Sequence, residues 1–142
     1  MKNIKELLSS RKLLTVPSGT SIYKAVCFMA DQNIGIVPIL DGDGKLLGVF
    51  SERDLVRRVI AKDLDLKTVA VDDIMSKDLL VADVNESYEE CLKKMQARHT
   101  RHIIIIENEK LLGILAMRDL LEIDVNVHKE TIEVLHNYIY SK

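Results

Sequence analysis

The chain has 142 residues, of which 47% are hydrophobic and 4% aromatic, and its formal net charge is −2 at pH 7. This length suits one domain or two small halves that share a core, and the slightly acidic balance lacks the basic excess of a general nucleic-acid-binding protein. No apolar stretch approaches the roughly 18 residues of a membrane span, and the charged N-terminus is unlike a signal peptide, so we expect a cytoplasmic protein with neither membrane nor nucleic-acid partners.

The first half of the chain has the signals of a β-α-β-β-α unit. Apolar residues recur at i, i+3, i+4 and i+7 from Ile22 to Met29, which predicts a one-sided helix with Thr20 or Ser21 as its N-cap. Pro38 lies inside an apolar strand and cannot donate a ladder hydrogen bond, so we expect an edge strand or a strand end there. The predicted elements are a helical lead-in at residues 4–8, strands at 13–16, 34–40 and 45–50, and a second helix at 52–61.

The second half repeats this order. A lead-in at residues 71–75 precedes strands at 79–82, 101–106 and 110–115 and helices at 87–98 and 117–123, and the charged residues 62–68 connect the halves. A last amphipathic helix is expected at 129–140, with Ile132, Leu135 and Ile139 on one face. The sequence therefore predicts repeats at residues 1–64 and 65–125 and a C-terminal helix within 126–142.

The strongest sign of duplication is a strand that turns directly into a helix. Gly48-Val49-Phe50-Ser51-Glu52-Arg53-Asp54 returns as Gly113-Ile114-Leu115-Ala116-Met117-Arg118-Asp119. Each copy has an Asp one turn inside the helix. A single half of this size would be marginally stable, so we expect the two to stack through their sheets about a pseudo-two-fold axis and to leave a groove at each end of the interface.

The order of these motifs, twice over, resembles a tandem pair of CBS domains, the regulatory unit also called a Bateman module. The motifs are Asp73-Ile74-Met75-Ser76, the Gly-x-x-Ser-x-x-Asp of residues 48–54, the strand with Pro38, and Arg101-His102 at the start of the equivalent strand. The resemblance implies an α/β fold and binding of an adenosine-containing ligand, such as AMP, ADP, ATP, S-adenosylmethionine or NAD. It also implies a homodimer that signals to an unknown effector protein.

The family's ribose-binding Asp maps onto Asp54 and Asp119, and its partner hydroxyl maps onto Ser51. Ala116 stands where the second hydroxyl should be, so the two grooves should be unequal. Arg101 and His102 alternate on a strand and should serve different grooves, an assignment that could be reversed. The first groove is expected to contain Ser51, Arg53, Asp54, Ser76, Leu80 and His102. The second is expected to contain Ser10, Leu14, Ile36, Arg101, Arg118 and Asp119.

These residues also have simpler interpretations. Ser51 can be only an N-cap, although capping does not explain why an acid recurs at Asp119 without its serine. Arg57 and Arg58 are interpreted as solvated, and Arg53 and Arg118 as either solvated or ligand-facing. The histidines, at 99, 102, 128 and 136, and the cysteines lack the spacing of a metal site, so no metal is expected. Cys27 and Cys91 are predicted to be reduced core residues.

Three classes of function are compatible with a chain of this kind. The favoured one is a stand-alone ligand-sensing module, and the alternative is a dimerisation scaffold with empty grooves. An enzyme is not expected, because the sequence lacks a nucleophile–base pair, a Gly-rich phosphate loop and metal-ligand spacing. Asp54 and Asp119 are assigned to separate grooves and are therefore not a catalytic carboxylate pair.

Overall fold

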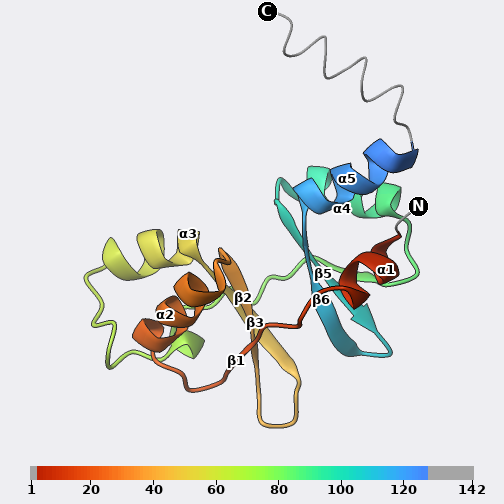
Figure 1. Ribbon diagram of the computed structural model, residues 1–142. Helices are drawn as coiled ribbons and strands as arrows, with labels where there is room; N and C mark the ends of the chain where they lie inside the picture. The colour runs from red at the N-terminus through yellow and green to blue at the C-terminus, as the bar shows by residue number, and fades with distance from the viewer. Residues whose placement is uncertain (1–2, 128–142) are drawn as a thin grey trace, which may run out of the picture. The chain divides into compact units, whose positions relative to one another are not determined.

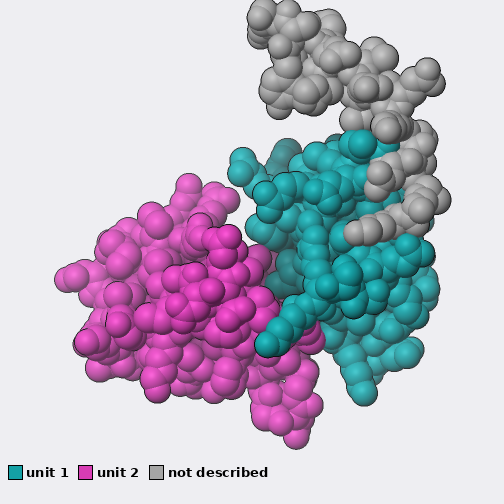
Figure 2. Space-filling model, in the orientation of Figure 1, with its two compact units in different colours: residues 1–12, 80–142 teal, residues 13–79 magenta. Residues whose placement is uncertain are grey.

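The computed structural model describes residues 3–127, so the helix expected at 129–140 lies outside the described residues. The chain divides into two compact units, shown in different colours in Figure 2. Unit 1 consists of residues 1–12 and 80–142, and unit 2 consists of residues 13–79. Each unit is an α/β structure with one three-stranded mixed sheet.

Unit 2 is built on the sheet order β1-β2-β3, with β1 parallel to β2 and β3 antiparallel to it. Figure 1 shows α2 and α3 on the same side of this sheet. The core between them is aliphatic apart from Phe50, which is fully buried. The elements are β1 (Val16–Pro17), α2 (Ile22–Gln32), β2 (Ile36–Leu40), β3 (Leu46–Ser51), α3 (Glu52–Asp54), the π-helix η1 (Leu55–Ile60) and the 3₁₀-helix η2 (Val71–Asp73).

Unit 1 repeats this plan with the sheet order β4-β5-β6. Two of its helices, α4 and α5, lie side by side in Figure 1. Its core contains no aromatic side chain among the fully buried described residues. The elements are α1 (Ile4–Ser9), β4 (Val81–Asp83), α4 (Tyr88–Arg98), β5 (His102–Glu107), β6 (Lys110–Ala116) and α5 (Met117–Val127).

The two long helices that follow the first strand of each repeat begin and end on local signals. The Ser21 and Ser87 side chains accept hydrogen bonds from the N–H groups of Lys24 and Glu90, as N-caps do. Both helices end at a left-handed residue, Asn33 in α2 and His99 in α4. The predicted helix and the Ser21 cap in the first half are confirmed.

The expected position of Pro38 at an edge is wrong, because β2 is the central strand of its sheet. Pro38 pairs with Val49, whose N–H and C=O bond instead to Ser76, at 2.9 and 2.8 Å. The Pro38 nitrogen therefore faces β1, whose pairing with β2 begins one residue later, at Val16–Ile39. A proline fits a central strand here because no ladder donor is needed at that point.

The first strand of each repeat begins later than predicted. β1 contains Pro17, which the sequence pattern assigns to a turn. An edge strand tolerates a proline, and the next residue, Ser18, donates its N–H to the Leu40 carbonyl at 2.8 Å. The short strands therefore take their limits from pairing with the central strand.

Each lead-in segment packs with the sheet of the other repeat. Ile4, Leu7 and Leu8 of α1 belong to the core of unit 1, around β5 and β6. Val71, Ile74 and Met75, which precede the second repeat, belong to the core of unit 2. Each compact unit is therefore formed by strands and helices of one repeat and the lead-in of the other.

In each sheet a glycine lies where the lead-in segment packs closely against a strand. A Cβ atom on Gly48 would lie 2.7 Å from the Ser76 carbonyl oxygen and 2.8 Å from the Met75 sulfur. A Cβ atom on Gly113 would lie 2.7 Å from Cδ2 of Leu8. A Cβ atom at either position would force its neighbour to shift, which gives both copies of the strand–helix motif a reason to begin with glycine.

Candidate functional site

The first repeated acid, Asp54, closes a reciprocal hydrogen-bonded turn between β3 and α3. The Ser51 hydroxyl accepts from the Asp54 N–H at 3.2 Å, and Asp54 Oδ2 accepts from the Ser51 N–H at 2.9 Å and from its hydroxyl at 3.1 Å. This is a capping box. Capping is therefore one role of Ser51, and it leaves a carboxylate that is only 9% exposed.

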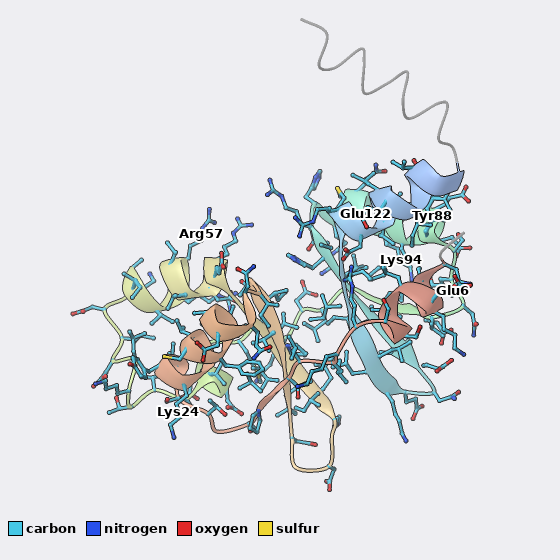
Figure 3. The ribbon with its side chains drawn as sticks, viewed as in Figure 1. Glu6, Lys24, Arg57, Tyr88, Lys94 and Glu122 are labelled. Atoms are coloured by element: carbon cyan, nitrogen blue, oxygen red, sulfur yellow. The ribbon has the colours of Figure 1, made fainter. Side chains whose placement is uncertain are left out.

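The second oxygen of Asp54 is less engaged than the first. In the described part of the chain its contact is an ion pair with Arg58, whose Nε lies 3.6 Å from Oδ1. Arg58 also donates to the Ile74 carbonyl at 3.2 Å, so the interpretation of this arginine as merely solvated is wrong. Arg57, by contrast, is exposed and points outward in Figure 3.

The second repeated acid, Asp119, occupies the equivalent turn between β6 and α5. The Ala116 N–H donates to Asp119 Oδ2 at 2.8 Å, so the acid caps the helix although the serine hydroxyl is missing. The Arg11 guanidinium completes the shell, with Nη2 2.6 Å from Oδ1 and Nη1 3.1 Å from Oδ2. Asp119 is 8% exposed, and its carboxylate is held by a bidentate arginine.

The ionisation of this turn follows from its contacts. Burial alone would raise the pKa of Asp119, but hydrogen bonds from Arg11 and Ala116, with the charges of Arg11 and Arg118, hold that pKa below its ordinary value. The hydrogen bond to Asp119 raises the pKa of Arg11 against the opposing effect of burial. Both partners are therefore charged at neutral pH.

His102 lies in the same turn region of unit 1. It pairs with Ala116 across β5 and β6, and its side chain is half-buried. Burial lowers the pKa of His102, while the Asp119 charge opposes this shift. The sequence analysis assigns His102 to the Asp54 groove and Arg101 to the Asp119 groove. The Arg101 carbonyl, in the same unit, accepts from the Met117 N–H at 2.8 Å, so the assignment of these two residues to different grooves stays a prediction.

The remaining predicted site residues differ in exposure and in partners. Ser10 donates its hydroxyl to the Leu7 carbonyl at 2.8 Å and so serves the end of α1. Ser76 pairs through its backbone with Val49, and Leu80 packs on the core of unit 1. Leu14 and Ile36 are half-buried, whereas Arg53, Arg101 and Arg118 are exposed. Asp54 shares unit 2 with Ser51, Arg53, Ser76, Leu14 and Ile36, and Asp119 shares unit 1 with Ser10, Leu80, Arg101, His102 and Arg118.

Arg11 is the residue that the sequence analysis missed. The register that aligns Leu13 and Leu14 with Leu79 and Leu80 also aligns Arg11 with Lys77, so a basic residue follows each lead-in. That recurrence is a signal that could have been used. The charge of Lys77, however, acts on Asp72, and only the packing of α1 in unit 1 brings Arg11 to Asp119.

Unit 2 contains a hollow of about 350 Å³. Gly35 and Glu52 stand where unit 1 has Arg101 and Met117, and Met117 packs against its core. Gly35 and Glu52 are both among the residues that line this hollow. It is lined by Val26, Met29, Ala30, Asn33, Ile34, Gly35, Phe50, Glu52 and Leu55.

The two cysteines differ. Cys27 is exposed, so its predicted place in the core is wrong: it lies on the solvent side of α2, opposite Ala25 and Met29. Cys91 is buried as predicted, and burial, with the charges of Glu86 and Glu90, raises its pKa to about 11.

Within residues 3–127 no three His, Cys, Asp or Glu side chains are grouped as metal ligands. Across the same residues, every helix is too short or too polar to span a membrane.

Comparison with known proteins identifies both repeats. Residues 4–61 and 71–126 each match the CBS domain. CBS domain-containing protein YhcV of Bacillus subtilis is 29% identical over 120 residues, which are 84% of this chain and 84% of that protein. CBS domain-containing protein CBSCBSPB5 of Arabidopsis thaliana is 31% identical over 104 residues, which are 73% of this chain. The chain spans only about a fifth, 19%, of that plant protein.

Solved structures share the fold. An uncharacterized conserved protein from Pyrococcus horikoshii is similar with a TM-score of 0.76 and 35% identity, over 86% of this chain and 91% of that one. CBS domain protein PAE2072 from Pyrobaculum aerophilum, solved in complex with AMP, is similar with a TM-score of 0.74 and 24% identity, over 83% of this chain and 89% of that one. At this identity the second similarity concerns the fold alone.

Proposed function

The chain belongs to the CBS-domain family, and we propose that it is a regulatory module that binds an adenosine-containing ligand through Asp54. In this proposal the chain is not an enzyme. Occupancy of the site is passed to an effector protein, and the working form is a homodimer. AMP is the first ligand to test, because it is bound in the PAE2072 structure, followed by ADP, ATP, S-adenosylmethionine and NAD.

The observation that carries the proposal is a buried carboxylate with one oxygen still available. Asp54 is 9% exposed, and its Oδ2 is used by the capping box, while the contact of Oδ1 within residues 3–127 is the 3.6 Å ion pair with Arg58. A buried carboxylate needs donors, and the two hydroxyls of a ribose supply them to a single acceptor group. Charge-assisted bonds of this type are stronger than neutral ones.

The phosphate end of the ligand belongs near Ser51 in this proposal. The Ser51 hydroxyl donates to Asp54 at 3.1 Å in the described structure, and it can turn this donor toward a phosphate while the Asp54 N–H still bonds to its oxygen. Arg53 is exposed one residue before Asp54 and adds positive charge to this side of the turn. The Asp119 turn has neither the hydroxyl nor an open carboxylate, and it is expected to bind ligand more weakly.

The proposal is tested by titration calorimetry with AMP on the wild-type chain and two charge-matched variants. Asp54→Asn removes the carboxylate charge and is expected to lower the affinity at least tenfold, since a buried charged hydrogen bond contributes about 1.5–3 kcal/mol. Asp43→Asn makes the same change on an exposed hairpin residue and should leave the affinity unchanged. Equal affinity in all three proteins would refute a role for Asp54.

The alternative function is a dimerisation scaffold without ligand. Val56 and Ile60, four positions apart on η1, are 61% and 58% exposed, and exposed apolar pairs of this kind suit a protein contact. Native mass spectrometry of the purified protein reports the oligomer and any retained ligand together. If no adenosyl ligand raises the unfolding temperature, and Val56→Ser with Ile60→Ser dissociates the dimer, the scaffold function is favoured.

A further inference from the structure

Asp119 has no open acceptor comparable to that of Asp54. Its two oxygens receive both terminal nitrogens of Arg11, at 2.6 and 3.1 Å, and Oδ2 also receives the Ala116 N–H at 2.8 Å. A bidentate guanidinium lies in the plane where two neighbouring hydroxyls would approach a carboxylate. A ribose and Arg11 therefore compete for the same oxygens.

Arg11 is placed so that its side chain can leave without disturbing the core. Its backbone N–H bonds to the Leu8 carbonyl at 3.1 Å, which fixes the end of α1. The helix itself is anchored by Ile4, Leu7 and Leu8 in the core of unit 1. The Arg11 side chain is 40% exposed, so rotation of the guanidinium into solvent breaks the ion pair and leaves the helix in place.

We propose that Arg11 is a gating residue for the Asp119 carboxylate: in the unliganded chain it occupies both oxygens, and a ribose binds there only after the guanidinium has swung away. This inference rests on the proposed function, because it concerns the second of the two family-assigned acids. It explains the inequality of the two sites by a competing side chain in addition to the missing hydroxyl of Ala116. Among the described residues the cation at the Asp54 turn is Arg58, whose Nε lies 3.6 Å from Oδ1, a longer contact than either Arg11 bond to Asp119.

The gate is tested in an Asp54→Asn background, in which only the Asp119 turn retains its carboxylate. Adenosine is the probe, because it carries the ribose hydroxyls without a phosphate that Arg11 could itself bind. Removal of the competitor by Arg11→Ala is expected to tighten adenosine binding about tenfold by calorimetry. Arg11→Lys, which keeps the charge but loses the fork of donors, should give an intermediate affinity.

Lys12→Ala is the matched control, because it removes one positive charge from the next, exposed residue. It should leave adenosine affinity unchanged. Addition of Asp119→Asn to the Arg11→Ala protein should abolish the gained binding, which identifies the site. Thermal unfolding of each variant verifies that it is folded, and Arg11→Lys serves for the comparison if Arg11→Ala is not.

The outcomes separate the gate from the function on which it rests. If Arg11→Ala and Arg11→Lys bind adenosine no more tightly than the Asp54→Asn parent, or bind it less tightly, the gate is overturned. The proposed function then still stands if the wild-type chain binds AMP through Asp54. If wild type does not bind AMP but the Arg11→Ala protein binds adenosine in an Asp119-dependent way, the gate stands and the assignment of the main site to Asp54 fails.

Discussion

Residues 48–54 in unit 2 and residues 113–119 in unit 1 make the same turn from a strand into a helix, but they hold their acids differently. Asp54 is held by its own turn, through Ser51, and by Arg58 one helical turn later. Asp119 keeps one local bond, from Ala116, and takes its main partner, Arg11, from a segment 108 residues away. Both turns thus contain a buried carboxylate. Its arginine partner is local in sequence at Asp54 and distant in sequence at Asp119.

The glycines that begin the two turns also differ in the kind of atom that lies next to them. Gly48 faces a backbone oxygen of Ser76, and Gly113 faces the end of the Leu8 side chain. A side-chain end can move to another rotamer, whereas a paired backbone segment cannot move without breaking its hydrogen bonds. In both halves the lead-in therefore lies close to a glycine, but the neighbour of Gly113 can shift more easily than the neighbour of Gly48.

Substitution of these glycines should give the largest difference between the halves. Gly48→Ala is expected to lower the free energy of unfolding by about 3 kcal/mol, and Gly113→Ala by about 1 kcal/mol, because overpacking costs more where the neighbour is backbone. Urea denaturation followed by circular dichroism measures both. Gly42→Ala, on an open hairpin turn with nothing within 4 Å of its added Cβ, is the control. Equal losses for Gly48 and Gly113 would show that both lead-ins are equally rigid.

Neutralisation of the two acids gives the next effect. Asp119→Asn removes the ion pair with Arg11 and should destabilise the chain by about 1 kcal/mol, a modest value because the guanidinium is 40% exposed and screened by solvent. Asp54→Asn keeps an oxygen for the capping box and should cost about 0.5 kcal/mol. A double-mutant cycle with Arg11→Ala and Asp119→Asn isolates the pair. A coupling energy near zero would contradict the pairing.

The Asp119 turn should contribute a pH-dependent part of the chain's stability in acid. Its pKa in the folded chain lies below the ordinary 3.8, so the folded state holds its proton less tightly than the unfolded state does. The carboxylate's stabilisation is therefore complete above pH 3.8 and is lost as the pH falls through the lowered value. Stability of Asp119→Asn relative to wild type, measured by urea unfolding between pH 5 and pH 2, should show a difference that shrinks toward low pH. A constant difference would mean that the aspartate's charge does not contribute.

Exchange of the capping residues should give similarly small effects and make the turns more alike. Ser51→Ala removes the hydroxyl that accepts from the Asp54 N–H and should cost about 1 kcal/mol. Ala116→Ser adds a hydroxyl at the start of α5 and should stabilise the chain by about 0.5 kcal/mol. Thermal unfolding measures both changes. A destabilising Ala116→Ser would indicate that the Arg11–Asp119 arrangement excludes the hydroxyl.

The local features of this fold could be predicted because they depend on residues close together in the chain. Periodic apolar residues and Ser21 predicted α2, and the same pattern with Ser87 predicted α4. The repeat itself singled out Asp54 and Asp119, which are the buried charged side chains among the described residues. Strand limits were less accurate, because β1 and β4 are defined by pairing with a neighbour rather than by their own composition.

The errors concern positions whose environment is made by distant segments. Pro38 fits a central strand because its nitrogen faces β1, whose pairing with β2 begins only at Val16–Ile39. Arg58 reaches the Ile74 carbonyl only because the second lead-in packs in unit 2. Cys27 was placed in the core on its apolar neighbours, although the face of α2 on which it lies is exposed.

The sequence by itself determined the duplication, the order of helices and strands in each half, and the two acids one turn into a helix, since periodicity, caps and turn residues act over a few residues. Tertiary structure alone decided the partner of the second acid. Leu8 packs against Gly113, this contact fixes the end of α1 beside β6, and Arg11 thereby meets Asp119 across a separation of 108 residues. A pair of this kind follows from the complementarity of packed surfaces, which no local pattern encodes.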